Sequence, residues 1–423
     1  MMYKETKDVE LKEIFSKTLL KTISAYANYH DGKIFIGVDD SGMVVGLKTI
    51  IDLKLDIENS INDSIIPKPR YEINTLNHSG KEILEILVFK GQDGPYYYKN
   101  KAYMRNDTST VPVDAVNLTR LVLSCKNLSF DQLDNSNSSL KFEYLTKKLV
   151  DELKINEVNQ SVLTTLGLSK NQTFNNGAVL LSDNGNLNQS YVDIAKFQYN
   201  TDIFIERMKF SNQSILKYYD ESIRFFNKYY MPYQVVEGEK RISKEKVPLV
   251  AFREVLANAI VHRDYLLNNG VQIAMFDNRI EVYSPGGLPE GITKEMYFNG
   301  LTSLTRNPII SYVFFRLGII EQFGTGIKRI INSYKKYNTY PSFLIQSSQI
   351  KIILPVLDYD YSTMNKVDAI IAYLGAYPNS SRKDIETSLN LDKSYTIGRL
   401  NELHKEHIIS ISGNGPSVRY TVL

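Results

Sequence analysis

Residues 253–265 read REVLANAIVHRDY. Written as a helix, this stretch places Glu254, Asn258 and His262 at i, i+4 and i+8, so their polar side chains form one stripe. Apolar residues cover much of the remaining helix surface and predict that it is buried. A buried polar group costs free energy unless it is paired or solvated. The stripe is therefore either a solvated face or a phosphate and Mg²⁺ site, with Asn258 as the metal ligand and Glu254 as the base for water.

Three motifs downstream favour the phosphate site. Residues 284–289 (SPGGLP) follow a predicted strand, residues 306–308 read RNP, and residues 321–327 (EQFGTGI) lead into a helix predicted over 327–334. In this order the motifs resemble the GHKL-class, HATPase-like domain at the C-terminus of "RecG-like" bacterial regulators, over roughly residues 170–355. The resemblance implies an α/β sandwich that binds ATP with Mg²⁺ between a sheet and helices.

The resemblance also assigns roles to individual residues. Asn258 would coordinate Mg²⁺, and Glu254 would be the catalytic residue that orients the attacking water in members that hydrolyse ATP. The other cofactor-binding residues would be His262, Gly286, Gly287, Arg306, Gly324, Thr325 and Gly326. The last three fit on physical grounds too, because glycines before a helix let backbone N–H groups approach an anion. For His262, a satisfied core histidine is the alternative interpretation.

The chain departs from the family where adenine is recognised. GHKL proteins carry an Asp in a DxGxG box that reads the adenine amino group, whereas Ser284-Pro285-Gly286-Gly287 stands at the corresponding strand end here. The loop glycines remain and the Asp does not, so the resemblance does not carry adenine recognition over to this chain. The chain also contains no G-x-x-x-x-G-K-[ST] motif, which excludes a P-loop helicase motor.

Composition sets the broad class. A length of 423 residues predicts two to four domains, and 43% apolar residues are enough for sizeable cores. The net charge of +3 does not by itself indicate a nucleic-acid partner. Cys125 is the only cysteine, which excludes a disulfide framework and a Cys-type zinc site. No signal peptide and no apolar run of membrane-spanning length is evident, so we expect a cytoplasmic protein without a membrane partner.

Residues 1–125 predict a compact α+β domain. A helix is predicted over 11–28, strands over 33–38, 81–89 and 96–104, and a hairpin turn at Asp39–Gly42. The stretches ETKDVELK and KTISAYANYHDGKIFIGVDDSGMVVG resemble the Schlafen/AlbA-like domain. One departure is that the family's Gly-Gly before the strand is Asp31-Gly32 here.

That resemblance implies nucleic-acid binding, or an RNA endonuclease with three carboxylates. The matching positions are Glu5, Glu10 and Asp40, which could bind Mg²⁺ or Mn²⁺ and activate water. The alternative is structural, with Glu5 and Glu10 near a helix N-terminus and Asp40 in a turn. The candidate phosphate contacts, each alternatively a solvated charge, are Lys12, Lys21, Lys33, Arg70 and Arg105.

The middle of the chain predicts a connector and then the HATPase-like domain. A polar run at 134–139 marks a boundary, and helices over 142–153 and 158–166 form a connector within 126–170. The HATPase-like domain would occupy 171–358. Its expected elements are strands over 177–181, 195–199 and 203–210, a helix over 214–230 with an aromatic core face, and a hairpin over 271–283 with Asp277 in the turn.

Residues 362–423 predict three helices and a hairpin. The helices are expected over 366–374, over 381–389 and from Asp392 to about residue 404, and the strands over 408–411 and 418–422. This order resembles a winged helix-turn-helix, whose third helix enters the major groove. The residues that would face DNA are Lys393, Ser394, Tyr395, Thr396 and Arg399, with Arg419 on the wing. The segment holds seven Lys and Arg against six Asp and Glu, so a protein-interaction or dimerisation module is the alternative.

Three hypotheses follow. The first is a DNA-binding, ATP-responsive transcriptional regulator, with DNA as the expected nucleic acid, RNA as its alternative, and a homo-oligomeric state. The second is a metal-dependent endonuclease of nucleic acids that uses the three carboxylates, with defence as its biological setting. The third is a non-catalytic interaction scaffold. Weak ATP hydrolysis is compatible with the first, because Glu254 is present.

Overall fold

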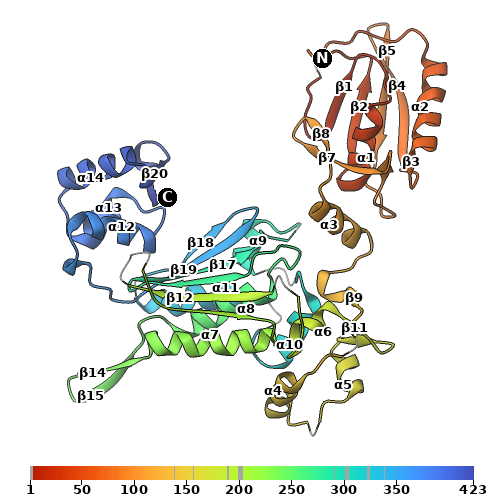
Figure 1. Ribbon diagram of the computed structural model, residues 1–423. Coiled ribbons are helices and arrows are strands. Elements are labelled where there is room, and N and C mark those ends of the chain that lie inside the picture. Colours follow the sequence, from red (N-terminus) through yellow and green to blue (C-terminus); the bar gives the residue numbers. More distant parts are fainter. Residues whose placement is uncertain are drawn as a thin grey trace. The chain divides into compact units, whose positions relative to one another are not determined.

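A computed structural model describes residues 3–137, 139–155, 157–187, 190–198, 203–289, 291–300, 304–321, 324–337 and 339–423. The chain divides into two compact units, Met1–Ser129 and Phe130–Leu423, whose elements are labelled in Figure 1. Gln322 and Phe323 of the EQFGTGI motif and Tyr199 of a predicted strand lie outside the described residues. Within the described ranges, no helix combines the length and the apolar character needed to cross a membrane.

In the first unit, two sheets pack against one buried helix. The main sheet has the order β1-β2-β5-β4, in which β1 runs parallel to β2 and the other neighbours are antiparallel. Its strands are β1 (Val9–Lys12), β2 (Gly32–Ile36), β4 (Tyr71–His78) and β5 (Lys81–Val88). The other elements are α1 (Leu19–Tyr29), α2 (Ile50–Ser64), β3 (Ile65–Ile66), β6 (Tyr97–Tyr98), β7 (Lys101–Asn106), β8 (Ser109–Pro112) and α3 (Ala115–Cys125). Nearly every residue of α1 is buried, because sheet strands cover it on more than one side.

The first unit corrects two predictions and confirms others. The predicted helix over 11–28 begins only at Leu19, and residues 9–12 form β1 instead, because pairing with β2 satisfies their backbone and buries the two central residues. The strand predicted over 96–104 is two strands, β6 and β7, because residues 99 and 100 adopt positive φ angles and form a tight turn. The predicted strands over 33–38 and 81–89 are present as β2 and β5.

The second unit is built on a six-stranded sheet of order β13-β12-β16-β17-β19-β18. β12 and β16 are parallel, and the other neighbours are antiparallel. The strands are β12 (Tyr191–Phe197), β13 (Phe204–Ser211), β16 (Val271–Met275), β17 (Arg279–Pro285), β18 (Ser342–Ile345) and β19 (Gln349–Pro355). One face carries the helices α7 (Ile215–Tyr230), α8 (Leu249–Val261) and α11 (Gly326–Tyr334) (Figure 1). The aromatic face of α7 lies in this shared core, as predicted.

Smaller elements surround this sheet. They are β9 (Asp134–Asn135), α4 (Glu143–Leu153), α5 (Gln160–Thr165), β10 (Ser169–Lys170), β11 (Thr173–Asn175), α6 (Asn176–Leu181), β14 (Tyr233–Glu237), β15 (Lys240–Lys244), α9 (Lys294–Asn299) and α10 (Pro308–Arg316). The strand predicted over 177–181 is wrong, because this stretch is α6. Its first turn is capped by the side chain of Asn175, and a short apolar run does not distinguish a buried strand from a buried helix. The predicted connector helices are present as α4 and α5.

The C-terminal segment has its elements in the predicted order. They are α12 (Lys366–Ala376), α13 (Arg382–Leu389), α14 (Lys393–Lys405), β20 (Ile409–Ser412) and β21 (Arg419–Val422). Ser381 and Asp384 form a capping box at α13, and the Asp392 side chain caps α14. The winged helix and the domain boundaries at 125, 170 and 358 remain predictions, because the order of the elements is their only support.

Candidate functional site

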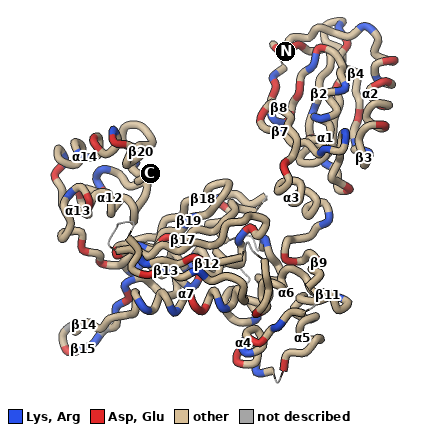
Figure 2. The backbone as a smooth tube through the Cα atoms, viewed as in Figure 1, with Lys and Arg blue, Asp and Glu red and all other residues tan. Residues whose placement is uncertain are grey.

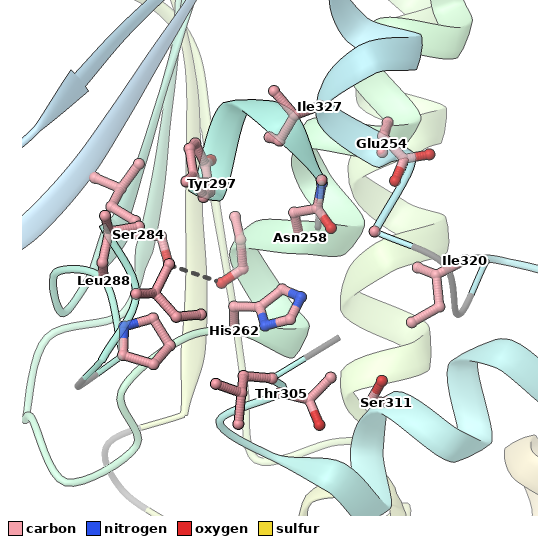
Figure 3. A pocket seen from close by; sticks show the side chains of 18 of the residues that line it. Glu254, Asn258, His262, Ser284, Leu288, Tyr297, Thr305, Ser311, Ile320 and Ile327 are labelled. Atoms are coloured by element: carbon pink, nitrogen blue, oxygen red, sulfur yellow. Dashed lines mark hydrogen bonds between the residues drawn. The ribbon is translucent and has the colours of Figure 1, made fainter. Parts of the chain in front are cut away.

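A cavity of about 730 Å³ lies between the sheet and α8. The floor is formed by β17 and β19, and the walls by residues 286–289, Ile292, α9, the N-terminal turns of α10 and the first turn of α11. Glu254, Asn258 and His262 project toward this space from α8 and the residue after it (Figure 3). The structure therefore brings together the three polar residues of the predicted stripe.

One end of the cavity is polar and tightly packed. Glu254 is 6% exposed, and its carboxylate lies 3.5 Å from the guanidinium of Arg329. A Cβ atom added to Gly326 would lie 2.3 Å from Oε1 of Glu254 and 3.1 Å from Nδ2 of Asn258. Burial raises the pKa of Glu254, while Arg329 and a hydrogen bond with Asn258 oppose the rise. The first residue of α11 is thus a glycine because the carboxylate and the amide occupy the space of a side chain.

The predicted glycine loop lies at this polar end. Gly324 and Gly326 line the cavity, and Gly324 adopts a positive φ of 64° that favours glycine. Thr325 does not line the cavity; its hydroxyl donates to Glu321 at 3.0 Å. Arg329 also contacts Glu321, so this arginine joins two carboxylates rather than lying free at the surface. It is a site residue whose role the sequence leaves undecided.

The HRD motif divides between the cavity and the loop that follows α8. His262 is partly buried and lines the cavity. Burial and the charge of Arg306 lower the pKa of His262 to about 4, so the imidazole is neutral at pH 7. Arg263 is almost fully buried and donates to the backbone oxygens of Leu267 and Asn269. These bonds give Arg263 a structural role and leave His262 as the residue of the pair that faces the cavity.

The glycines of the SPGGLP motif allow close approach of other chain segments. A Cβ on Gly286 would lie 2.2 Å from the guanidinium of Arg306, and one on Gly287 would lie 2.6 Å from the backbone oxygen of Gln346. Arg306 donates to the oxygen of Gly287 at 2.9 Å and lies 3.5 Å from the carboxylate of Asp264. Arg306 therefore fixes the loop, although the sequence predicted a direct contact with the cofactor.

Asn307 holds the end of α8, a role that the sequence did not reveal. Its Nδ2 atom donates to the backbone oxygens of Val261 at 2.8 Å and Arg263 at 2.9 Å. These carbonyls lie at the C-terminus of α8, where no intrahelical donor is left for them. The RNP motif thereby positions His262. In the sequence, the only indication of this role is that RNP follows SPGGLP closely along the chain.

In the first unit, two of the three predicted carboxylates, Glu5 and Glu10, are paired with basic side chains. Arg105 donates to Glu10 at 2.5 Å, Lys12 lies 2.6 Å from Glu10, and Lys12 also lies 3.6 Å from Glu5. Asp40 is exposed in the turn after β2. In the part of the chain that the structure describes, no three or more His, Cys, Asp or Glu side chains form a group that could hold a metal ion. The helix N-terminus offered as an alternative setting for Glu10 is also wrong, because Glu10 lies in β1.

Two family models match separate parts of the chain. The model described as "Schlafen, AlbA_2" matches residues 5–114, and the model described as "Putative ATP-dependent DNA helicase recG C-terminal" matches residues 268–354. The chain carries a Schlafen AlbA_2 domain and a RecG C-terminal-type domain. The second match contains the cavity residues from Gly286 to Gly326 but begins after α8, so the polar stripe lies outside it. These domain types indicate a nucleic-acid-related function and an ATPase-like fold.

Solved structures supply weaker likenesses. The DIP2311 protein from Corynebacterium diphtheriae is 16% identical over 99% of this chain and 92% of its own, with a TM-score of 0.49. The N-terminal domain of a "Putative ATP-dependent DNA Helicase RecG-related Protein" from Nitrosomonas europaea is 24% identical over 23% of this chain and 73% of its own, with a TM-score of 0.21. No curated protein matches the chain.

The candidate phosphate contacts of the Schlafen AlbA_2 domain differ in exposure. Lys33 is exposed and lies 3.6 Å from Glu85, while Lys21 is partly buried with its ammonium 6.0 Å from the ring of Tyr103. Arg105 is wrong as a phosphate contact, because its side chain is 1% exposed and paired with Glu10. Basic and acidic residues are both distributed over the two units in Figure 2.

The expected DNA face of α14 is only partly available. Lys393 and Ser394 are exposed, and Tyr395 is partly buried with Arg399 5.5 Å from its ring. Thr396 is fully buried, and its hydroxyl donates to the backbone oxygen of Asp392. The prediction that Thr396 contacts DNA is therefore wrong. Arg419 lies in β21 at the hairpin and donates to backbone oxygens of the preceding turn.

Proposed function

We propose that the RecG-type domain binds a nucleoside triphosphate with Mg²⁺ in the cavity, and that the chain is a DNA-binding regulator that responds to this nucleotide. The observation that carries the proposal is the convergence of Glu254, Asn258 and Gly326 at one end of a cavity large enough for a nucleotide. Mn²⁺ could replace Mg²⁺, since both prefer oxygen ligands.

The residues at the polar end fit a phosphate and metal site. The α11 helix has nine residues, and its first turn presents backbone N–H groups and a positive dipole end to the cavity. Glycine at position 326 leaves the backbone accessible beside Glu254 and Asn258. Asn258 supplies an amide oxygen of the kind that Mg²⁺ binds, and the ion, when bound, would neutralise phosphate charge.

Glu254 has the properties of a water-orienting base. It is buried beside the predicted phosphate position, and burial raises the pKa of its carboxylic acid, which makes the carboxylate a stronger base. The guanidinium of Arg329 lies 3.5 Å from the carboxylate. This arrangement supports slow hydrolysis as an accompanying activity, with Glu254 accepting the proton of the attacking water.

The α11 helix also offers a connection between the cavity and the C-terminal segment. It begins at Gly326 beside the cavity and ends at the fully buried Tyr334, about 12 Å further along its axis. Just beyond it, the hydroxyl of Thr339 hydrogen-bonds that of Tyr377 at 2.7 Å. A nucleotide that moves the first turn of α11 would therefore also act on the segment that holds the predicted DNA-reading helix.

The polar end should lose affinity when the proposed metal ligand is removed. Asn258→Ala is expected to weaken MgATP binding at least about tenfold, because loss of a metal-site ligand typically has effects of that order or more. Isothermal titration of the full chain with ATP, with Mg²⁺ and then with EDTA, measures it. Asn401→Ala on the exposed surface of α14 is the matched control. Equal MgATP affinity in wild type and Asn258→Ala would place the nucleotide elsewhere.

DNA binding should depend on the nucleotide. Saturating MgATP is expected to change the affinity of the full chain for duplex DNA by about fivefold or more, a common size for coupling between two sites. Fluorescence anisotropy with a pool of labelled duplexes measures it, and Asn258→Ala should abolish the response. An unchanged dissociation constant at saturating MgATP would contradict the regulatory part of the proposal while leaving nucleotide binding intact.

A further inference from the structure

The end of the cavity away from Glu254 lacks a carboxylate. Among the described lining residues, Glu254 and Glu321 are the acidic ones, and Arg329 holds both. Asp264 does not line the cavity; it accepts from the backbone N–H of Leu266 at 3.0 Å and pairs with Arg306. No carboxylate therefore faces a bound base from the described residues at this end.

His262 is the side chain best placed to meet the base. It lies eight positions after Glu254, which corresponds to about 12 Å along the helix axis. It lines the cavity near Ser284 and Thr305 (Figure 3). The hydroxyl of Ser284 donates to the oxygen of Ala259 at 2.9 Å, whereas the imidazole of His262 has no hydrogen-bond partner in the described part of the chain.

The apolar walls of the cavity favour a flat ring. Leu288, Tyr297, Ile350 and Ile352 contribute apolar surface from the loop, from α9 and from β19. The ring of Tyr297 is held edge-on by Phe343, with centroids 6.5 Å apart and an interplanar angle of 76°. Apolar walls with one polar group are the usual setting for a planar ligand, and a purine would cover more of them than a pyrimidine.

We propose that His262 meets the base edge where a carboxylate is absent, and that the cavity accepts adenine and guanine nucleotides with similar affinity. The inference rests on the proposed nucleotide site. A carboxylate only accepts hydrogen bonds, so it suits the amino group of adenine and repels the O6 oxygen of guanine. A neutral imidazole has one donor and one acceptor, and its proton can occupy either nitrogen. It therefore suits the edge of either purine.

The test compares nucleotides on the full chain. ATP, GTP and CTP displace a trinitrophenyl-ATP probe in the presence of Mg²⁺, and ATP and GTP are expected to agree within about threefold, a difference well under 1.4 kcal/mol. CTP is expected to be at least about tenfold weaker, because it leaves apolar wall uncovered. His262→Asp is expected to weaken the binding of GTP at least about tenfold relative to that of ATP. The new carboxylate and the O6 oxygen of guanine are both acceptors, and a buried mismatch of this kind is costly.

The controls separate this inference from the proposed function. Arg306 lies close enough to lower the pKa of His262, so its charge also favours a carboxylate at position 262 and helps the variant to fold. His407→Asp, at an exposed position with positive φ, should leave the ATP to GTP ratio unchanged. Wild-type binding of ATP with GTP more than about thirtyfold weaker would overturn the inference alone. If no nucleotide binds, ATP included, both the proposed function and the inference are overturned.

Discussion

Replacement of Glu10 by alanine is expected to destabilise the Schlafen AlbA_2 domain by about 3–5 kcal/mol, because it leaves the buried Arg105 without its counter-charge. The two side chains are 8% and 1% exposed and lie 2.5 Å apart. Arg105 also donates to Thr110 at 3.0 Å and to the backbone oxygen of Thr6 at 3.3 Å. These bonds join β1 to β7 and β8, so the loss affects the contact between the two sheets.

A double-mutant cycle separates this structural role from catalysis. Thermal unfolding of the full chain, followed by hydrogen exchange within residues 5–114, should show a melting temperature lower by roughly 10 °C or more in Glu10→Ala. Glu10→Ala combined with Arg105→Met should recover much of the loss, because replacing both partners of a buried pair by apolar groups is often neutral. Glu13→Ala, at an exposed position after β1, is the matched control.

The same variant decides between structure and nuclease chemistry. Incubation of wild type with mixed tRNA and duplex DNA, in Mg²⁺, Mn²⁺ or EDTA, reports any metal-dependent cleavage. EDTA-sensitive products that disappear in Glu10→Ala, without any change in its melting temperature, would contradict the structural assignment and favour a catalytic one. Intact substrates are expected, since basic side chains occupy both oxygens of Glu10.

The sequence predicted the elements whose evidence is local. The stripe of Glu254, Asn258 and His262 depends only on helical spacing, and the structure brings all three to one cavity although α8 ends at Val261. The spacing still holds at residue 262 because its backbone N–H continues the helical pattern to the oxygen of Asn258 at 2.9 Å. Caps such as Asp392 were predictable for the same reason, since a side chain bonds a backbone group three residues away.

The sequence could not predict what depends on distant partners. Residues 11 and 12 fit a helical pattern until β2, more than twenty residues away, pairs with them. Arg329 is ambiguous in a sequence, because only the fold brings it to Glu254 from another helix. Thr396 lies where the third helix of a winged helix would face DNA, yet the packing of this segment buries its side chain. In each case a tertiary contact overrides the local preference.

Gly326→Val is expected to reduce nucleotide affinity at least about a hundredfold. The added Cβ would lie 2.3 Å from Oε1 of Glu254, so either the carboxylate or the first turn of α11 must move. Glu254 cannot swing freely, because it is buried and paired with Arg329. The valine side chain would also occupy the space through which the N–H groups of α11 approach phosphate. A displacement of about 1 Å can cost a hundredfold in a site that depends on the positions of its groups.

Gly398→Val is an unusually close control for this change. Gly398 is also a helical glycine, in α14, and a Cβ there meets no atom within 4 Å. Both variants therefore replace a helical glycine by valine, and only Gly326→Val fills the cavity. Titration of the full chain with MgATP should show weak or absent binding for Gly326→Val and wild-type affinity for Gly398→Val. If Gly326→Val folds and binds MgATP like the wild type, the phosphates do not approach the first turn of α11, and the polar end of the cavity is not the nucleotide site.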